Sequence, residues 1–341
     1  MLELRRIIST WKLRSRTLEL GRRTLVMGVV NITPDSFSDG GKFLDAEAAI
    51  AHGISLFDEG ADLLDLGAES TRPGSRAGGE ERPVHPNDQD LSLGTPAVHP
   101  NDQDLSLGPP AVSAEEELER LLPVLRGILA ARPEAIVSID TYKADTARAA
   151  LAAGAEIVND VSGLHWESGL ARVCAEAGCG VVLMHTRGRP EEWRKQAQLQ
   201  SNELLAAVRA GLETSLERAA LAGIAREAIV LDPGYGFGKR FGENFALLAR
   251  QAELLALGRP LFAGVSRKSF LGNALAPLYG GQPAPVGVRE TASLAALTAA
   301  ILHGASVVRV HSVREAREAA AIADAVVENN LPGGSIRTPQ G

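Results

Sequence analysis

The side chains with the clearest chemical potential are acidic and amide groups that follow buried apolar runs. In residues 229–239, IVLDPGYGFGK, three branched apolar residues typical of a strand covered on both faces lead into Asp232, and Pro233 prevents the strand from continuing. Such a carboxylate can hold a ligand, or it can simply close a turn. The stretch is not a nucleotide-binding P-loop, because residues 234–239 are one residue too few and Arg240 replaces the required Ser or Thr.

The same change from an apolar run to polar groups occurs seven more times along the chain. The groups are Asn31, the ESTRPG stretch at 69–74, Asp140, Asn159 with Asp160, His185, the SRKS stretch at 266–269, and Arg309 with His311. Any one of them could be a helix cap or a turn residue. Because all eight runs end in hydrogen-bonding or charged groups, a ligand-binding site is the better interpretation.

The types of these groups indicate the kind of ligand. Asp140, Asn159 and Asp232 can accept and donate along the edge of a planar heterocycle rich in N–H groups, where a charge-assisted hydrogen bond contributes about 1.5–3 kcal/mol. Cations that suit a phosphate or pyrophosphate are Arg72, Lys268, Arg309 and His311. Asn31 and Asp39 offer the hard oxygens that Mg²⁺ prefers, whereas no His and Cys cluster has zinc spacing.

Eight strand candidates alternate with segments of helical spacing. We predict strands at 25–30, 63–66, 136–139, 156–158, 181–184, 229–231, 261–263 and 307–310. We predict helices at 45–60, 113–131, 143–153, 167–177, 191–222, 241–256, 288–303 and 313–327, with Asp45 as the first N-cap. Eight such units close a (β/α)8 TIM barrel, in which the carboxyl ends of all strands face one mouth.

An open, doubly wound α/β sheet is the alternative arrangement of these units. It would normally carry G-x-G-x-x-G after the first strand, but residues 30–35 read VNITPD. We therefore expect a single α/β domain, a barrel over residues 25–330, followed by a disordered tail at 331–341. Residues 1–24 are basic like a transit peptide, yet they contain acidic residues and an alternating run, so we predict an N-terminal β-hairpin extension.

One segment fits no strand–helix unit. Residues 84–97 read VHPNDQDLSLGTPA, and residues 98–111 repeat them with one change, Thr95 to Pro109. Pro, Gly, Asn and Asp dominate both copies, so neither can build a core. We interpret residues 84–111 as a tandem duplication inside a flexible loop insert of the barrel.

Composition excludes several classes of protein. The net charge of −7 argues against a general nucleic-acid binder, so any anion site must be local. No apolar run approaches the ~18 residues that a membrane span needs. Cys174 and Cys179 have neither zinc nor redox-pair spacing, and we expect reduced, structural thiols in a cytoplasmic protein.

Eight motifs together resemble the dihydropteroate synthase family of folate biosynthesis, over residues 26–320. They are MGVVNITPDSFSDGG from Met27, ESTRPG from Glu69, SIDTYK from Ser138, VND from Val158, MHTRGRP from Met184, LDPGYGFGK from Leu231, SRKSF from Ser266 and RVH from Arg309. The resemblance implies a TIM barrel and a transferase that joins 6-hydroxymethyl-7,8-dihydropterin pyrophosphate to p-aminobenzoate, releasing pyrophosphate with Mg²⁺. It also implies a homodimer and a sulfonamide target.

The resemblance assigns a role to each matching position. The pterin would be held by Asp140, Asn159, Asp232 and Lys268, with Met184 and Gly264 lining its slot. The pyrophosphate would be held by Asn31, Arg309 and His311, and Mg²⁺ by Asn31 and Asp39. The p-aminobenzoate pocket would comprise Phe37, Thr71, Arg72, Pro73, Phe237, Lys268 and Ser269, with the ligand carboxylate facing a helix N-terminus at Ser269.

The expected chemistry agrees with this distribution of charge. Breaking the carbon–oxygen bond to pyrophosphate in a dissociative, SN1-like step leaves a pterin-stabilised cation and a departing anion. The site then needs negative charge near the ring, for which Asp140 is the candidate, and positive charge near the leaving group, from Lys268, Arg309 and His311. The chain departs from the family at Ser312, where Asp is usual, and at the insert after ESTRPG.

Two other functions stay open at this point. A pterin-binding methyltransferase domain shares the barrel and the Asp, Asn, Asp set, but we would not expect it to carry SRKS together with RVH. A non-catalytic paralogue that binds pterin without turnover is the second alternative, although Asn31, Lys268 and Arg309 are all present.

Overall fold

The computed structural model describes residues 6–32, 41–69 and 112–329. Part of the predicted site lies outside these ranges. The site residues concerned are Phe37, Asp39, Thr71, Arg72 and Pro73. The predicted loop insert 84–111 and the predicted tail 331–341 also lie outside the described residues.

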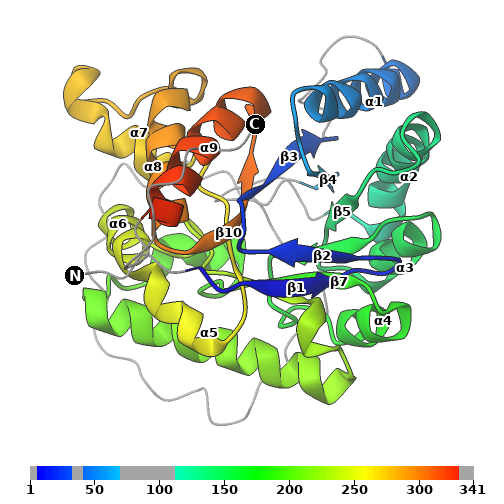
Figure 1. Ribbon diagram of the computed structural model, residues 1–341, viewed down its shortest axis with the longest axis horizontal. Helices are drawn as coiled ribbons and strands as arrows, with labels where there is room; N and C mark the ends of the chain where they lie inside the picture. Colours follow the sequence, from blue (N-terminus) through cyan, green and yellow to red (C-terminus); the bar gives the residue numbers. More distant parts are fainter. Residues whose placement is uncertain (1–5, 33–40, 70–111, 330–341) are drawn as a thin grey trace, which may run out of the picture.

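The eight predicted strands form a closed barrel in which every paired neighbour is parallel (Figure 1). They are β3 (Leu25–Asn31), β4 (Leu63–Gly67), β5 (Val137–Asp140), β6 (Ile157–Asp160), β7 (Gly180–Met184), β8 (Ile229–Asp232), β9 (Leu261–Ala263) and β10 (Ala305–Val310). Strand β10 pairs with β3 and closes the barrel, which confirms the TIM-barrel prediction. No observed bound differs from its prediction by more than two residues.

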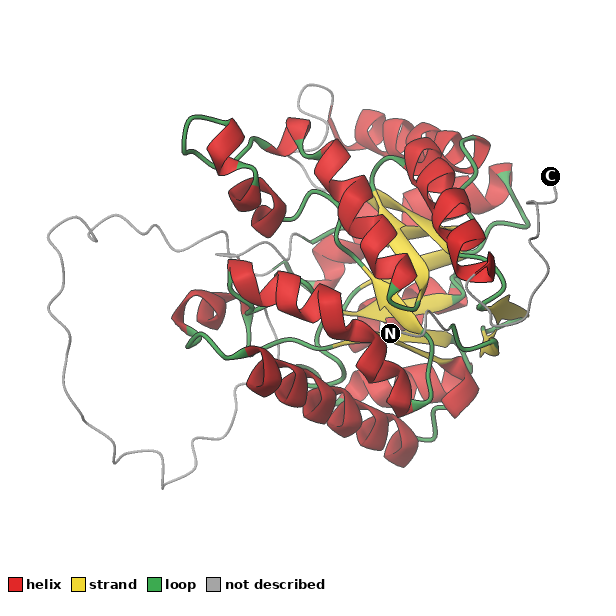
Figure 2. Cartoon of the chain, turned by 60° about the vertical axis from the view of Figure 1, so that its left-hand side comes forward, coloured by secondary structure: helices red, strands yellow, loops and turns green. Residues whose placement is uncertain are grey.

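Helices surround these strands, as Figure 2 shows. The α-helices are α1 (Gly41–Asp58), α2 (Ala114–Ala131), α3 (Ala144–Ala152), α4 (Gly169–Ala177), α5 (Ser201–Ala222), α6 (Phe241–Arg250), α7 (Ser269–Ala274), α8 (Glu290–Leu302) and α9 (Val313–Asn329). Short 3-10 turns are η2 (Pro190–Lys195), η3 (Arg226–Ala228), η4 (Gln251–Leu257), η5 (Ala276–Leu278) and η6 (Val286–Val288). Helix α7 begins at Ser269, as the family resemblance implied.

The predicted helix 191–222 is wrong, because it is two elements, η2 and α5. Tertiary contacts hold the chain between them in extended form. Arg187 donates to the carbonyl oxygen of Ala197 at 2.8 Å, and the carboxylate of Glu243 on α6 accepts from the backbone N–H of Leu199 at 2.7 Å. Two smaller predictions also fail: α1 begins at Gly41, so Asp45 is not its N-cap, and the helix predicted to 256 turns into η4 at Gln251.

Strand side chains alternate between the two faces of the barrel wall, as the pleat requires. The inward set forms one apolar cluster: Leu25, Met27, Leu63, Ile157, Val182, Val230, Phe262 and Val307. On six of these strands, the next inward position lies two residues toward the carboxyl end of the strand. These positions are Asp65, Asn159, Met184, Asp232, Gly264 and Arg309. The interior of the barrel therefore changes from apolar to polar within a single step of the pleat.

A two-stranded antiparallel hairpin covers the apolar end of the barrel. It consists of β1 (Ser9–Lys12) and β2 (Thr17–Leu20), coloured blue in Figure 1, and confirms the predicted N-terminal hairpin. Trp11, Leu13 and Leu20 are buried and join the apolar cluster inside the barrel. The indole N–H of Trp11 donates to the carbonyl oxygen of Ala228 at 2.9 Å, so the hairpin is fixed as well as buried.

The described residues bear on the predictions about membrane spans and cysteines. None of the helices there is both long and apolar enough to cross a membrane. Cys174 and Cys179 are buried and form no disulfide, in agreement with structural thiols.

Candidate active site

Polar side chains at the carboxyl end of the barrel converge on the guanidinium of Arg309. Arg309 donates through Nη2 to the carboxylate of Asp140 at 3.0 Å and through Nε to the carboxylate of Asp65 at 2.6 Å. The same oxygen of Asp65 accepts from the amide nitrogen of Asn159 at 2.9 Å. Three consecutive strands, β4, β5 and β6, thus meet the last strand, β10, in one hydrogen-bonded network.

Asp232 and Lys268 adjoin this network at Gly264. A Cβ atom added to Gly264 would lie 4.0 Å from Arg309 Cβ and 4.0 Å from the Asp232 carboxylate. Lys268, at the N-cap of α7, interacts electrostatically with Asp140, Asp232 and Arg309. The structure therefore brings together the residues that the sequence predicted for the heterocycle.

Sequence reasoning missed Asp65, because it considered only the residues that follow each strand. Asp65 lies within β4, in the apolar run Leu63–Gly67, and is completely buried. A buried carboxylate requires an ionic or hydrogen-bonding partner. The charge inside an otherwise apolar strand was the signal that could have revealed this residue.

Burial shifts the pKa values of three groups in the site toward their neutral forms, and neighbouring charges oppose or add to these shifts. Burial raises the pKa of Asp140 to about 7, against the lowering effect of Arg309 and with a further rise from Asp65 and Glu117. Burial also raises the pKa of Asp232 to about 6, against the hydrogen bond from the N–H of Gly234. The pKa of Lys268 is lowered to about 8 by burial and by the nearby Arg309. Such perturbed groups at one mouth are typical of an active site.

Lys268 also lies over an aromatic ring that the sequence assigned to the second substrate. Its ammonium is 3.9 Å from the centroid of Phe237, a cation–π distance. Phe237 packs edge-to-face on Trp193, with 5.0 Å between ring centroids. Met184 belongs to the same apolar cluster and is almost fully buried.

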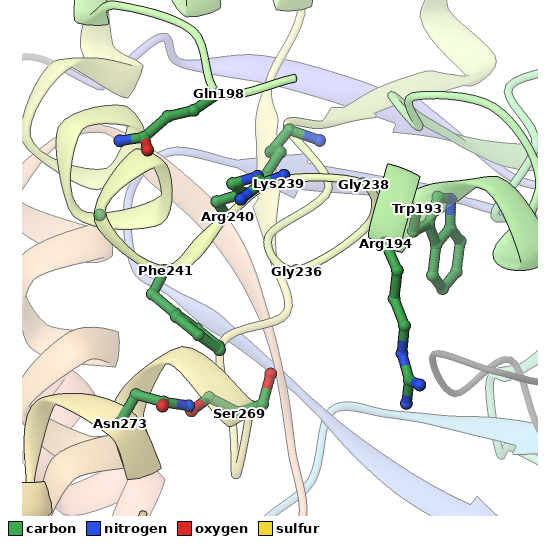
Figure 3. Close-up of a pocket in the computed structure, with 11 residues that line it drawn as sticks. Trp193, Arg194, Gln198, Gly236, Gly238, Lys239, Arg240, Phe241, Ser269 and Asn273 are labelled. Carbon is green, nitrogen blue, oxygen red and sulfur yellow. The ribbon is translucent and has the colours of Figure 1, made fainter. Parts of the chain in front are cut away.

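A cavity of about 530 Å³ opens beside Trp193 (Figure 3). It lies between η2, the loop after β8 and the start of α7. It is lined by Trp193, Arg194, Gln198, Gly236, Gly238, Lys239, Arg240, Phe241, Gly242, Ser269 and Asn273. In Figure 3 the hydroxyl of Ser269 and the ring of Phe241 lie on one side of the cavity and Arg194 on the other. The cavity thus reaches from Ser269, one of the predicted p-aminobenzoate residues, to the exposed cationic groups of Arg194 and Arg240.

The glycines of the loop after β8 allow its backbone to approach the neighbouring strand. Gly234 has φ +71°, and a Cβ there would lie 2.0 Å from the carbonyl oxygen of His185. Lys239 is buried and donates to the carbonyl oxygens of His185, Gly234 and Phe237 at 2.7–3.3 Å. The lysine of this P-loop-like stretch therefore binds its own loop, which positions Phe237.

His311, which follows β10, lies beside the side chain of Ser266. Its Nδ1 lies 3.0 Å from the hydroxyl of Ser266. Ser312, at the position where the family usually has Asp, accepts from Arg267 at 3.1 Å. Arg267 has φ +57°, an uncommon conformation for a residue with a side chain, and its ion pair with Glu290 at 3.2 Å helps to hold it.

Two of the polar strand ends do not face the site. The carboxylate of Asp160 accepts from the backbone N–H groups of Ser162 and Leu164, so it closes a turn. The ring of His185 packs against Gly211 on α5, and burial lowers its pKa. Asn31, in contrast, is exposed at the end of β3, where it pairs with Gly67.

A buried ion cluster holds the chain on both sides of the undescribed residues 70–111. Lys143 donates to Glu69 at 2.5 Å and to Glu117 at 2.9 Å. The carboxylate of Glu69 also accepts from the backbone N–H of Val112 at 3.1 Å. Burial raises the pKa of Glu117, and Lys143 opposes that rise.

Comparison with known proteins agrees with this geometry. The model of the family described as "Pterin binding enzyme" matches residues 27–84 and 106–311. Dihydropteroate synthase of Mycobacterium leprae is 41% identical over 294 residues, which cover 86% of this chain and 90% of that protein.

Solved structures give the same result. The Xanthomonas albilineans dihydropteroate synthase with 4-aminobenzoic acid has a TM-score of 0.74 and 36% identity, covering 94% of this chain and 98% of that one. The Yersinia pestis enzyme in a sulfonamide drug complex has a TM-score of 0.75 and 34% identity, covering 94% and 99%. The chain belongs to the dihydropteroate synthase family of pterin-binding enzymes.

Proposed function

We propose that the charged mouth of this barrel performs the family reaction, in which dihydropterin pyrophosphate and p-aminobenzoate give dihydropteroate and pyrophosphate. The chain is a transferase with dihydropteroate synthase activity in folate synthesis. The observation that carries the assignment of residues is the network of Asp65, Asp140, Asn159 and Arg309, with Asp232 and Lys268 beside it.

The pterin is assigned to the acidic side of the network. Asp140, Asn159, Asp232 and Lys268 would hold its polar edge, and Met184 and Gly264 would line its faces. Support comes from the buried carboxylates on neighbouring inward strand positions and from the space beside Gly264, where a Cβ would meet nothing closer than 3.9 Å. The lack of a side chain at Gly264 lets the face of a flat ring approach the backbone at this position.

Bond cleavage is proposed to be dissociative. As the carbon–oxygen bond to pyrophosphate breaks, the positive charge that develops on the pterin side is stabilised by Asp140. The negative charge on the leaving group is stabilised by Arg309, His311 and Lys268. Preorganised charges of this type are worth about 3–4 kcal/mol each in a transition state.

The p-aminobenzoate is assigned to the space beside Phe237, Lys268 and Ser269, together with Phe37, Thr71, Arg72 and Pro73 outside the described residues. The relative from X. albilineans was solved with 4-aminobenzoic acid, and the cation–π pair of Lys268 and Phe237 offers an aromatic surface for such a ring. The aromatic amine attacks the electrophilic carbon directly, so no strong base is required.

Mg²⁺ is the proposed cofactor, held by Asn31 and Asp39. Mg²⁺ keeps several of its waters and needs only one or two protein oxygens beside substrate phosphates. Among the described residues, Asn31 is exposed at the end of β3, so its amide oxygen is available for such a contact. When bound, the ion would neutralise charge on the pyrophosphate.

A homodimer is the proposed assembly. Exposed apolar side chains occur on α6, on η5 and the residue after it, and on η6: Phe245, Leu278, Tyr279, Val286 and Val288. Helices α6, α7 and α8 lie on one side of the barrel in Figure 1. Light scattering coupled to gel filtration tests this proposal, and a monomer at micromolar concentration contradicts it.

The decisive experiment measures pyrophosphate release when the purified chain is mixed with Mg²⁺ and both substrates. We expect release that depends on p-aminobenzoate and is lost when EDTA is added. A parallel assay with labelled methyl-tetrahydrofolate and a corrinoid protein tests the methyltransferase alternative. Pterin binding without pyrophosphate release would instead identify a non-catalytic paralogue.

A further inference from the structure

Asp65 contacts both functional ends of the site although it does not reach the mouth itself. It is completely buried, and one carboxylate oxygen accepts from Arg309 Nε at 2.6 Å and from Asn159 Nδ2 at 2.9 Å. Asn159 belongs to the proposed pterin site and Arg309 to the proposed pyrophosphate site. A single buried group therefore joins the two.

The contact with Asn159 decides which end of its amide faces the substrate. A carboxylate that is ion-paired with Arg309 accepts hydrogen bonds and cannot donate them. The amide nitrogen must therefore point to Asp65, which leaves the amide oxygen for the ligand. The site consequently selects a heterocycle that presents an N–H donor at this position.

The contact with Arg309 decides how the guanidinium is turned. Asp65 engages Nε and Asp140 engages Nη2, so both carboxylates lie on the same edge of the guanidinium. The donors of Nη1 are engaged by neither carboxylate. They are the donors that can meet an anion at the mouth.

We propose that Asp65 is a positioning residue that fixes the acceptor of Asn159 toward the heterocycle and the Nη1 end of Arg309 toward the leaving group. This inference depends on the proposed function. Asp65 touches neither substrate, and its effect on the reaction passes through the two residues that it holds.

The charge of Asp65 also reaches Asp140. The groups that act on Asp140 are Arg309 from β10, Asp65 from β4, Glu117 from α2 and Lys268 before α7. Asp65 and Glu117 raise the pKa of Asp140, whereas Arg309 and Lys268 lower it. Removal of the Asp65 charge should therefore lower the pKa of Asp140 and shift the acid limb of the pH–rate profile to lower pH.

The test compares the wild type with Asp65→Asn and with Ser138→Ala as the matched control. Ser138 is buried on β5, pairs with Asp65 across the sheet, and its hydroxyl has no hydrogen-bond partner among the described residues. For Asp65→Asn we expect kcat to fall about 10- to 100-fold and the acid limb to shift to lower pH. Ser138→Ala should retain the wild-type rate and profile.

Binding of 6-hydroxymethylpterin, followed by calorimetry, provides a readout that does not need turnover. Because an asparagine at position 65 can both donate and accept, it no longer fixes the amide of Asn159, and binding should weaken about tenfold. Asp65→Glu retains the charge, so its acid limb should stay at the wild-type pH; this variant provides the readout if Asp65→Asn does not fold.

Wild-type binding and an unshifted acid limb in Asp65→Asn would overturn the proposal, as would a shifted limb in Asp65→Glu. These outcomes differ from failure of the proposed function, in which the wild type itself releases no pyrophosphate. In that case the calorimetric comparison still decides whether Asp65 positions Asn159.

Discussion

The two ends of the barrel interior are built from the same strands but serve different purposes. At the amino end the inward side chains are apolar and are covered by Trp11 and the hairpin. At the carboxyl end, one pleat step further, they are Asp65, Asn159, Asp232 and Arg309. The apolar end contributes burial, whereas the polar end holds charges whose desolvation opposes folding. Stability and chemistry are thus separated along the barrel axis.

The largest expected effect is that of Lys268→Ala at the polar end. Loss of the ammonium removes a cation beside Asp140 and Asp232 and the partner of the Phe237 ring, so kcat/KM should fall on the order of a thousand-fold or more. Lys12→Ala, at an exposed position on the hairpin, is the control. Equal turnover by the two variants would contradict the role given to Lys268.

Trp11→Ala is the corresponding change at the apolar end. The indole is completely buried and hydrogen-bonded, so its removal should lower the free energy of unfolding by about 3–5 kcal/mol and leave kcat of the folded enzyme unchanged. Chemical denaturation measures the first quantity and steady-state kinetics the second. Ile8→Ala, at an exposed apolar position nearby, should change neither. A large fall in kcat for Trp11→Ala would show that the two ends are not separate.

Asp140→Asn should lower kcat about a hundredfold and raise the KM for dihydropterin pyrophosphate much less. The charge of Asp140 matters most as the cation develops in the transition state, whereas an asparagine can still bind the ground state. Steady-state kinetics with both substrates distinguishes the two parameters, and the exposed Asp145→Asn on α3 is the control. A change confined to KM would argue for binding alone.

The smallest effect concerns pH, where stability and activity should change in opposite directions. The pKa of Asp140 is raised to about 7 and that of Asp232 to about 6, above the unfolded value of about 3.9. Between about pH 4 and pH 7 the folded chain therefore binds more protons than the unfolded chain, and the free energy of unfolding falls as pH rises. Activity, which requires the charged carboxylates, should rise over the same window.

Urea denaturation of the wild type and of Asp140→Asn between pH 5 and about pH 8 tests this sign. We expect the pH dependence to be weaker in the variant, because one of the two perturbed carboxylates is gone. A wild-type protein that gains stability as pH rises through this window would contradict the prediction.

The strands of the barrel could be predicted from the sequence because their positions depend on short runs of apolar residues. Branched apolar runs such as those at β8 and β10 end at polar groups, and the structure reproduces them within two residues. Asp140, Asn159, Asp232 and Arg309 could be grouped because parallel strands deliver their carboxyl ends to one mouth. These inferences needed no knowledge of individual contacts.

What could not be read depends on contacts between distant segments. The break between η2 and α5 follows from Arg187 and from Glu243 on α6, and local helix propensity gives no sign of it. The hydroxyl of Ser266, 45 residues before His311, contacts its ring, and the departure from the family at Ser312 could not predict this contact. For Asp65, the charge inside an apolar strand was visible in the sequence, but its partners on β6 and β10 were not.

The hydrogen bond from Val112 to Glu69 has an evolutionary consequence. The same carboxylate, held by Lys143, meets the chain where residues 70–111 begin and where they end. A segment whose two ends are already joined can gain residues at little thermodynamic cost, since each doubling of its length adds only about 0.6 kcal/mol. The contacts of Glu69 with Val112 and Lys143 therefore explain how the segment could acquire a second copy of VHPNDQDLSLGTPA without loss of the barrel fold. They also make this loop a suitable position for inserting foreign peptides.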